Sequence, residues 1–199
     1  MIARRGLTPE TVVDAATAIV ESDGMEALTL TRVAHALGVK PPSLYNHVAG
    51  LDSLRRAVTL QTFEGLGRRL GAAAMGRSGR EALQAVAAEV RTYATNHPGL
   101  YELTTRARPE DEEYAAASMR AVEPVLAILR GYHMNEDEAI HAARALRSAL
   151  HGFVSLENSG GFGLDVDIDE SFSWLVQRLA DMFEPHAAEN FNAVAPSST

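Results

Sequence analysis

Apolar side chains recur along most of this chain at intervals of three and four residues, the spacing that places them on one face of an α-helix. The first such segment follows Thr8, a good N-cap residue, and has Pro9 at its first helical position. It ends at Gly24, and its apolar stripe consists of Val12, Ala15, Ala16, Ile19 and Val20. No alternating pattern typical of a β-strand persists beyond a few residues. The pattern therefore predicts an all-α protein.

The same periodicity predicts a series of further helices. A short helix over about 31–37 stops at Gly38, and Pro41 and Pro42 open another that carries residues 43–48. A long helix follows over about 52–74, and later periodic segments cover about 80–95, 98–106, 110–131, 136–157 and 169–184. The breaks divide the chain into a small N-terminal domain (1–51), a larger helical domain (52–185) and a tail expected to be disordered (186–199).

The two short helices and their Gly-containing turn describe a helix-turn-helix. Val33, Leu37 and Leu44 supply apolar contacts that would lock the pair together. Such a pair presents the start of its second helix to the major groove of DNA, and the polar residues of this segment suit that role. The candidate DNA-binding residues are Arg4, Arg5, Thr29, Thr31, Lys40, Pro41, Pro42, Ser43, Tyr45, Asn46 and His47.

These candidates divide by the part of the DNA that they would contact. Tyr45 and His47 offer donors to phosphates, which position a protein without specifying sequence. Lys40, Ser43 and Asn46 are short or flexible enough to reach base edges. The two threonines would donate to a flanking phosphate, and the two N-terminal arginines would form a basic arm that reaches the backbone or the minor groove.

The stretch "LTLTRVAHALGVKPPSLYNHVAGLDSLRRAV" (28–58) resembles the DNA-binding segment of TetR-family transcriptional regulators. The resemblance lies in the threonines before the second helix, in "ALGV" and in "PPSLYNHV", and it extends from residue 8 to about residue 60. A later stretch, "ALHGFVSLENSGGFG" (149–163), is similar to the C-terminal domain of the TetR subgroup that is marked by a His-Gly pair. One position departs from the family, which often has a phosphate-contacting lysine where this chain has Leu51.

The resemblance implies an N-terminal helix-turn-helix domain followed by a helical bundle for ligand binding and dimerisation. It also implies a homodimer on a two-fold-symmetric DNA site, with repression that a small ligand relieves. The chain itself carries two apolar stripes that would make a four-helix interface between two copies. These residues are Ile140, Leu146, Leu150, Phe153, Phe172, Leu175, Leu179 and Met182. The same stripes could instead pack within their own domain.

The middle helices carry the candidates for an effector pocket, because ligand pockets are mostly apolar with a few polar groups. The candidates are Phe63, Met75, Tyr93, Tyr101, Leu103, Arg106, Met119, Val122 and His151. Each of them could equally be an ordinary core residue. An apolar pocket would favour an apolar or aromatic effector.

The composition of the chain excludes several kinds of site and of protein. The 199 residues are 46% hydrophobic and include no cysteine, so the chain has no disulfide, thiolate zinc site or cysteine nucleophile. No signal peptide or membrane-spanning run is found, and a cytoplasmic protein is expected. The net charge of −8 argues against a generally DNA-coated surface, so a DNA-binding face must be local. Lys40 is the one lysine of the chain, and it lies in the helix-turn-helix.

Other chemistries find little support. A calcium loop starting at Asp165 would need glycine where Glu170 stands, and no zinc-binding His-Glu-x-x-His occurs. We expect no metal, no cofactor and no enzymatic activity. The favoured hypothesis is a ligand-responsive repressor, released from a palindromic operator by a small apolar or aromatic effector. The alternative is a small-molecule-binding helical dimer with weak or lost DNA binding, which the acidic net charge and Leu51 make conceivable.

Overall fold

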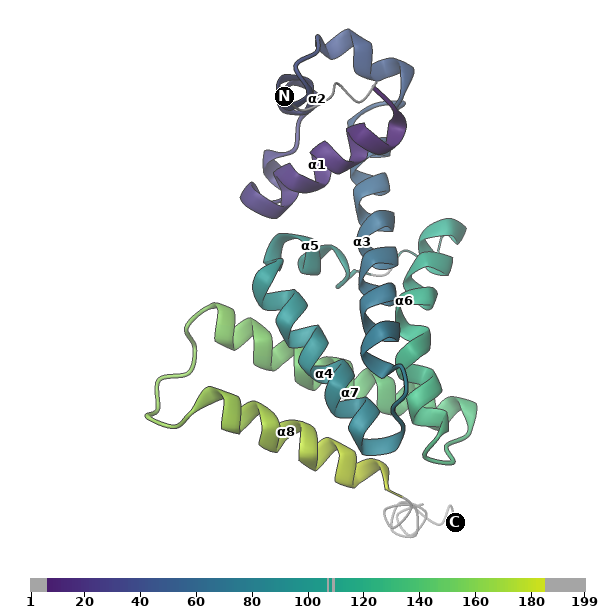
Figure 1. Cartoon of the computed structure of the whole chain (residues 1–199), viewed down its shortest axis with the longest axis vertical. Coiled ribbons are helices and arrows are strands. Elements are labelled where there is room, and N and C mark those ends of the chain that lie inside the picture. Colours follow the sequence, from purple (N-terminus) through teal and green to yellow (C-terminus); the bar gives the residue numbers. More distant parts are fainter. Residues whose placement is uncertain (1–6, 107, 109, 185–199) are drawn as a thin grey trace, which may run out of the picture. The chain divides into compact units, whose positions relative to one another are not determined.

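The computed structural model describes residues 7–106, 108 and 110–184, and all regular elements within them are helical (Figure 1). The elements are α1 (Pro9–Asp23), η1 (Met25–Ala27), α2 (Leu30–Leu37), η2 (Pro41–Asn46), α3 (Leu51–Ala74), α4 (Gly79–Asn96), α5 (Pro98–Leu103), α6 (Glu112–Arg130), α7 (Glu136–Asn158) and α8 (Ile168–Phe183). The all-α prediction is confirmed. Arg4, Arg5 and the predicted tail lie outside the described residues. Among the described residues, no helix combines the length and apolar character that crossing a membrane requires.

Local signals set the helix ends where the sequence predicted them. The Thr8 hydroxyl accepts a bond from the Thr11 N–H at 3.3 Å, and the Thr11 hydroxyl accepts one from the Thr8 N–H at 2.9 Å. Gly38 ends α2 in the left-handed region, with φ of 67°, which only glycine adopts at little cost. Asn135 and Glu138 cap α7 reciprocally in the same way as the threonines cap α1.

The chain forms two compact units. The first comprises the described residues up to Leu66 together with Asn96–Ala121, and the second comprises Gly67–Thr95 and the residues from Val122 onward. Helices α3 and α6 therefore contribute residues to both units. This division differs from the boundary expected at residue 51, because the helix-turn-helix shares its unit with α5 and the first part of α6.

In the first unit, α5 lies directly against α1. A Cβ atom added at Gly99 would lie 2.6 Å from the backbone carbonyl oxygen of Val20, closer than any side chain allows. Nearby, His97 Nδ1 is 2.5 Å from the Glu21 carboxylate. The absence of a side chain at Gly99 is therefore what permits the two helices to approach so closely.

A second set of contacts fixes the start of α6 within the first unit. The Arg56 guanidinium donates two hydrogen bonds to the Asp111 carboxylate, at 2.6 and 2.7 Å, and a third group of the same side chain lies 2.8 Å from Glu113. Asp111 also accepts the Tyr114 N–H at 3.0 Å, as an N-cap does. These bonds, led by those from Arg56, hold the pKa of Asp111 well below its usual range.

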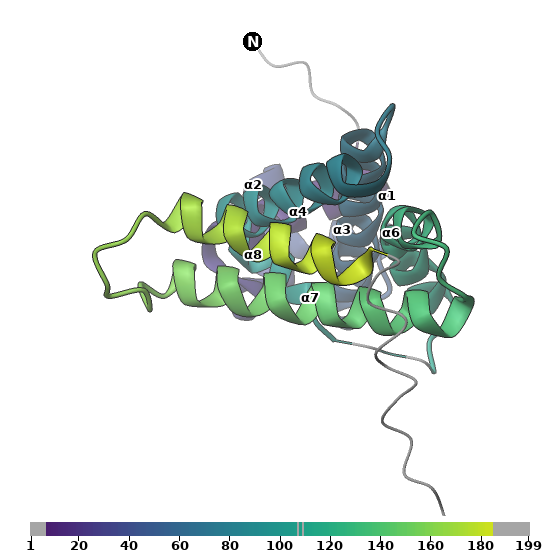
Figure 2. The ribbon, with the colours of Figure 1, turned by 90° about the horizontal axis from the view of Figure 1, so that it is seen from below.

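In the second unit, α7 and α8 lie side by side and are joined by the loop 159–167 (Figure 2). Arg91 of α4 connects them. Its guanidinium bonds to Glu157 at 2.5 and 2.8 Å, lies 2.7 Å from Asp169, and sits 4.8 Å from the ring centroid of Phe172. One side chain therefore joins α4 to the end of α7 and to the start of α8, in an environment that raises the pKa of Arg91 through its bond to Glu157.

The contact between α5 and α1 predicts opposite effects for two Gly→Ala substitutions. Gly99→Ala should destabilise the protein by about 1–3 kcal/mol, because the new methyl group overlaps the Val20 carbonyl. Gly65→Ala, on α3, is the matched control: no atom lies within 4 Å of its added Cβ, and the helix should gain about 0.5–1 kcal/mol. Urea unfolding followed by circular dichroism measures both. Equal stabilisation by the two changes would contradict the close approach of α5.

The Arg56–Asp111 contact predicts a pH-dependent contribution to stability. A carboxylate with a lowered pKa stabilises the fold above the unfolded value of about 3.9, and the contribution is lost as the pH falls through the lower folded value. Asp111→Asn should therefore destabilise the protein at pH 7, and the difference from the parent should shrink on acidification below about pH 4. Asp52→Asn, at an exposed surface pair, should change little. A difference that stays constant down to pH 2 would exclude the ion pair as its source.

Candidate nucleic-acid interface

The geometry of the helix-turn-helix depends on a tight turn and a buried side chain. After α2, the Gly38 N–H donates to the His35 carbonyl at 3.1 Å and the Val39 N–H donates to the Ala34 carbonyl at 2.9 Å. The chain then enters η2, whose Leu44 is fully buried. The turn and this anchor fix which side of η2 faces the solvent.

The predicted helix, which Pro41 and Pro42 open and which carries residues 43–48, is instead the 3₁₀ helix η2 (Pro41–Asn46). Its bonds join residues three apart: the Ser43 N–H donates to the Lys40 carbonyl at 2.9 Å, and the His47 N–H donates to the Leu44 carbonyl at 2.8 Å. A run of six residues completes few α-helical bonds, and short pieces commonly adopt this tighter form. The side chains that would meet DNA are therefore arranged with a period of three residues.

The structure brings most of the predicted DNA-binding residues to the surface of one motif. Lys40, Pro42, Tyr45 and Asn46 are exposed on η2, with Tyr45 61% exposed. The other predicted members of η2 and its cap, Pro41, Ser43 and His47, are half-buried. Thr29 and Thr31 are exposed at the start of α2.

Thr29 is a candidate DNA-binding residue and also the N-cap of α2. Its hydroxyl oxygen accepts the Arg32 N–H at 3.2 Å, which caps α2. The hydroxyl hydrogen stays available to donate, so the cap is compatible with a phosphate contact.

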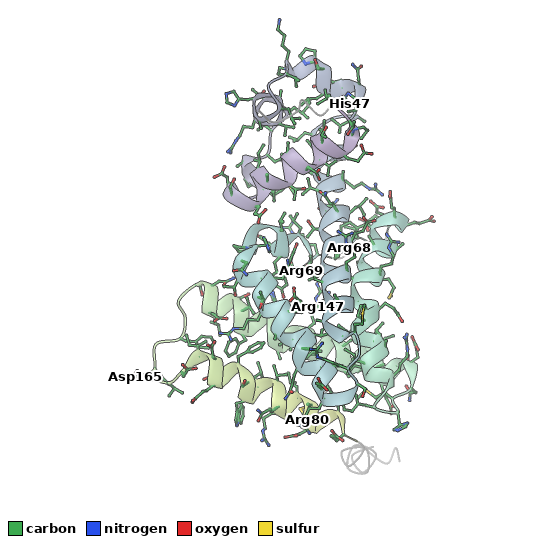
Figure 3. All side chains as sticks on the ribbon, in the orientation of Figure 1. His47, Arg68, Arg69, Arg80, Arg147 and Asp165 are labelled. Carbon is green, nitrogen blue, oxygen red and sulfur yellow. The ribbon has the colours of Figure 1, made fainter. Side chains whose placement is uncertain are left out.

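His47 lies near the start of α1 (Figure 3). The pKa of Glu10 is lowered, chiefly by a hydrogen bond to its own backbone and another from Thr8, and to a smaller extent by the charge of His47. The imidazole and the N-terminal end of α1, whose free N–H groups favour anions, therefore belong to the same neighbourhood.

The predicted DNA-binding residues did not include the arginines around the helix-turn-helix. Arg32 forms an ion pair with Asp23 and also donates to the Ala27 carbonyl at 3.4 Å. Arg55 lies 3.5 Å from Asp52, one turn into α3. Leu51, where the family often has lysine, is half-buried, so its side chain packs against the protein rather than reaching outward. Spacing alone does not separate a paired arginine from one that is available to DNA.

The predicted pocket residues are scattered. In the first unit Phe63 is buried, Tyr101 and Leu103 are half-buried, and Arg106 and Met119 are exposed. In the second unit Tyr93 is buried with Arg69 5.4 Å above its ring, Val122 and His151 are half-buried, and Met75 is 76% exposed. The assignment of Met75, Arg106 and Met119 to an enclosed pocket is wrong, because these three side chains lie in solvent.

The error on α6 has a specific cause. The buried stripe of its first half is Tyr114, Ala117 and Ala121, which pack with Phe63 and leave Met119 on the outer side. The rings of Phe63 and Tyr114 meet edge to face at 5.1 Å. Two alanines give only a weak hydrophobic signal for the buried face of α6. The larger side chain of Met119 was therefore assigned to the pocket by mistake.

The predicted dimer stripes also need correction. Leu146, Leu150, Phe172 and Leu179 are buried in the core of their own unit, so they have no surface left for a partner. Ile140, Phe153 and Leu175 are half-buried, and Met182 alone of the eight is largely exposed. The outer faces of α7 and α8 instead carry Leu156, which follows Phe153 at the spacing of the predicted stripe, and Trp174, which was not predicted. Trp174 lies two residues after Phe172, outside the three- and four-residue spacing of the predicted α8 stripe, and was therefore overlooked.

An all-helical chain that presents exposed donors on an anchored helix-turn-helix is a DNA-binding protein in its architecture. A family profile described as "Tetracyclin repressor-like, C-terminal domain" matches residues 83–179. The uncharacterized HTH-type transcriptional regulator Rv0681 of Mycobacterium tuberculosis is 40% identical over 176 residues, 87% of this chain and 80% of that protein. YobS of Bacillus subtilis, another uncharacterized HTH-type transcriptional regulator, is 33% identical over 178 residues, 89% of this chain and 93% of that protein.

The fold agrees with these relatives. A solved structure of a TetR variant from Acinetobacter baumannii AYE in complex with minocycline superimposes with a TM-score of 0.65 at 22% identity, covering 89% of this chain and 97% of that one. The chain belongs to the TetR family, and it is a DNA-binding transcriptional regulator. Its assignment to the His-Gly subgroup stays a prediction.

Two adjacent residues of η2 should separate structure from DNA contact. Leu44→Ala should cost about 2–5 kcal/mol of stability, because it empties a fully buried site. Tyr45→Ala should change stability by less than about 0.5 kcal/mol, because the ring is exposed, and should still weaken DNA binding. Chemical unfolding and DNA-binding titrations of both variants test this. The prediction fails if Tyr45→Ala unfolds as readily as Leu44→Ala.

Proposed function

We propose that this chain is a ligand-responsive repressor that binds a two-fold-symmetric operator as a homodimer. The observation that carries the proposal is the exposed set on η2, held in place by the buried Leu44. The family's usual mode of action, and the match of residues 83–179 to a tetracyclin repressor-like domain, support release by a small effector. The similar Acinetobacter protein is in complex with minocycline. The effector proposed here is a small apolar or aromatic compound. The site of action is the cytoplasm.

DNA contacts divide by role. Tyr45 and His47 donate to phosphates and set the position of the protein on the duplex. Lys40, Ser43 and Asn46 reach base edges in the major groove and discriminate between sequences. The Thr29 and Thr31 hydroxyls bind the flanking phosphate, and Arg4 and Arg5 supply positive charge for the DNA backbone or the minor groove.

The effector acts from the helical domain, residues 52–185, on the helix-turn-helix. Helix α3 contributes residues to both compact units, so a shift along it alters the unit that contains η2. Helix α5 offers a second route, because Gly99 brings it against Val20 of α1. A coupling of about 1–3 kcal/mol between effector and operator suffices to release the DNA.

Two copies are needed to match a symmetric operator, and the outer faces of α7 and α8 are proposed to join them. Trp174 is 62% and Met182 60% exposed on α8, eight residues apart on one helical face. Leu156 is 49% exposed on α7. Large exposed apolar side chains on neighbouring helices are typical of a surface that a partner covers.

The alternative is a small-molecule-binding helical dimer with weak or lost DNA binding. The net charge of −8 and the half-buried Leu51 favour it. The two functions differ in their response to salt, because a protein that neutralises several phosphates loses affinity steeply as salt rises.

The decisive experiment is fluorescence anisotropy of the purified protein on DNA from upstream of its own gene, across a salt series. The repressor should bind selectively, with two subunits per site, and the logarithm of its affinity should fall linearly with the logarithm of salt concentration. Absence of selective binding there, together with no motif recovered from a random-sequence selection, would overturn the DNA-binding role and leave the alternative.

The division of DNA contacts predicts two kinds of variant. Tyr45→Phe should weaken binding to all sequences alike, because it removes a phosphate donor. Lys40→Ala and Asn46→Ala should change the preference between operator variants by about 1–3 kcal/mol, because each removes a base contact. Thr92→Ala, exposed on α4, serves as the control. Equal losses on every sequence for all three variants would contradict the assigned roles.

A further inference from the structure

The loop 159–167 between α7 and α8 has a defined conformation. The Gly161 N–H donates to the Leu156 carbonyl at 2.7 Å, and the Phe162 ring packs 4.8 Å from that of Phe153. At the other end, the Asp167 carboxylate accepts the Glu170 N–H at 2.8 Å and caps α8. The loop is therefore attached to its own helices at both ends.

Between these attachments the loop directs apolar side chains into solvent. Leu164 is 87% exposed and Val166 is 65% exposed, on either side of Asp165. Figure 3 shows Asp165 on the loop, beyond the ends of the two helices that it joins. A built loop that holds two branched aliphatic side chains away from its own core is suited to contact another surface.

A surface of matching chemistry lies on α7. Ala145, Ser148 and Gly152 are exposed and spaced by three and four residues, so they form one line of small side chains. Such a line leaves room for larger side chains that belong to another surface. Arg144 is exposed beside it, and neither Arg144 nor Asp165 forms an ion pair with another described residue.

We propose that the loop 159–167 is an arm that docks on α7 of a second copy of this chain, with Asp165 paired to the copy's Arg144. Leu164 and Val166 then cover the copy's line of small residues. The inference rests on the proposed homodimer and names a contact that completes it.

Charge complementarity selects a second copy over an unrelated partner. The arm is acidic and apolar, whereas the receiving face of α7 is basic and lined by small side chains. In a closed two-fold dimer each copy supplies both surfaces, so both arms are satisfied at once.

A charge swap tests the arm in the full chain. Asp165→Arg and Arg144→Asp each place like charges together twice per dimer, and each should raise the dimer dissociation constant roughly tenfold or more. The double variant Asp165→Arg/Arg144→Asp should restore the dissociation constant to within about threefold of the parent. Glu110→Arg, exposed in the turn before α6, is the matched charge control and should leave it unchanged. Sedimentation equilibrium over a dilution series measures all four proteins.

Leu164→Ser provides an independent readout. The residue is almost fully exposed, so thermal stability at concentrations where the chain is monomeric should not change, whereas the dissociation constant should rise. A dimer that is indifferent to the single charge variants, or that the double variant fails to restore, would overturn the arm and leave the homodimer standing. A parent protein that is monomeric at all concentrations would overturn the proposed function itself.

Discussion

Burial of Leu44 is the constraint on which the DNA-facing surface depends. A 3₁₀ helix of six residues has no stability of its own, since helix formation is cooperative and short segments are marginal. The side chain of Leu44 is fully buried, and that of Val48 nearly so, so the apolar core of the first unit holds η2 at its middle and just beyond its end. The exposed donors of η2 are therefore positioned by side chains that DNA never touches.

Two further contacts fix helices of the first unit that lie outside the helix-turn-helix. Gly99 lets α5 touch the backbone of α1, and Arg56 ties the start of α6 to α3. These contacts differ in kind: one is a steric fit that tolerates no added atom, and the other is an ion pair that tolerates displacement. A change in α5 would therefore be transmitted to α1 with little loss, whereas the start of α6 can shift and keep its partner.

Helix boundaries followed from the sequence because their signals are local. Thr8, Gly38 and Asn135 each act on the backbone within a few residues, so their effect needs no knowledge of the fold. The exposure of most candidate DNA-binding residues on one motif was predictable for a related reason, since they lie in one short segment. Which side of α6, α7 and α8 is buried depends on neighbours far away in the sequence. The pairs Phe63–Tyr114 and Arg91–Glu157 illustrate this, because no neighbouring residue in the sequence indicates which distant side chain each of them contacts.

Lys40 has a consequence for chemical reactivity. It is exposed at the head of η2 and is the one lysine of the chain, so its side chain carries the chain's one ε-amine for acylating reagents. Acylation would remove the positive charge of Lys40 from the surface that is proposed to contact bases. Conversely, a duplex bound at this surface would shield that amine. The rate at which Lys40 is acylated would therefore report whether DNA is bound.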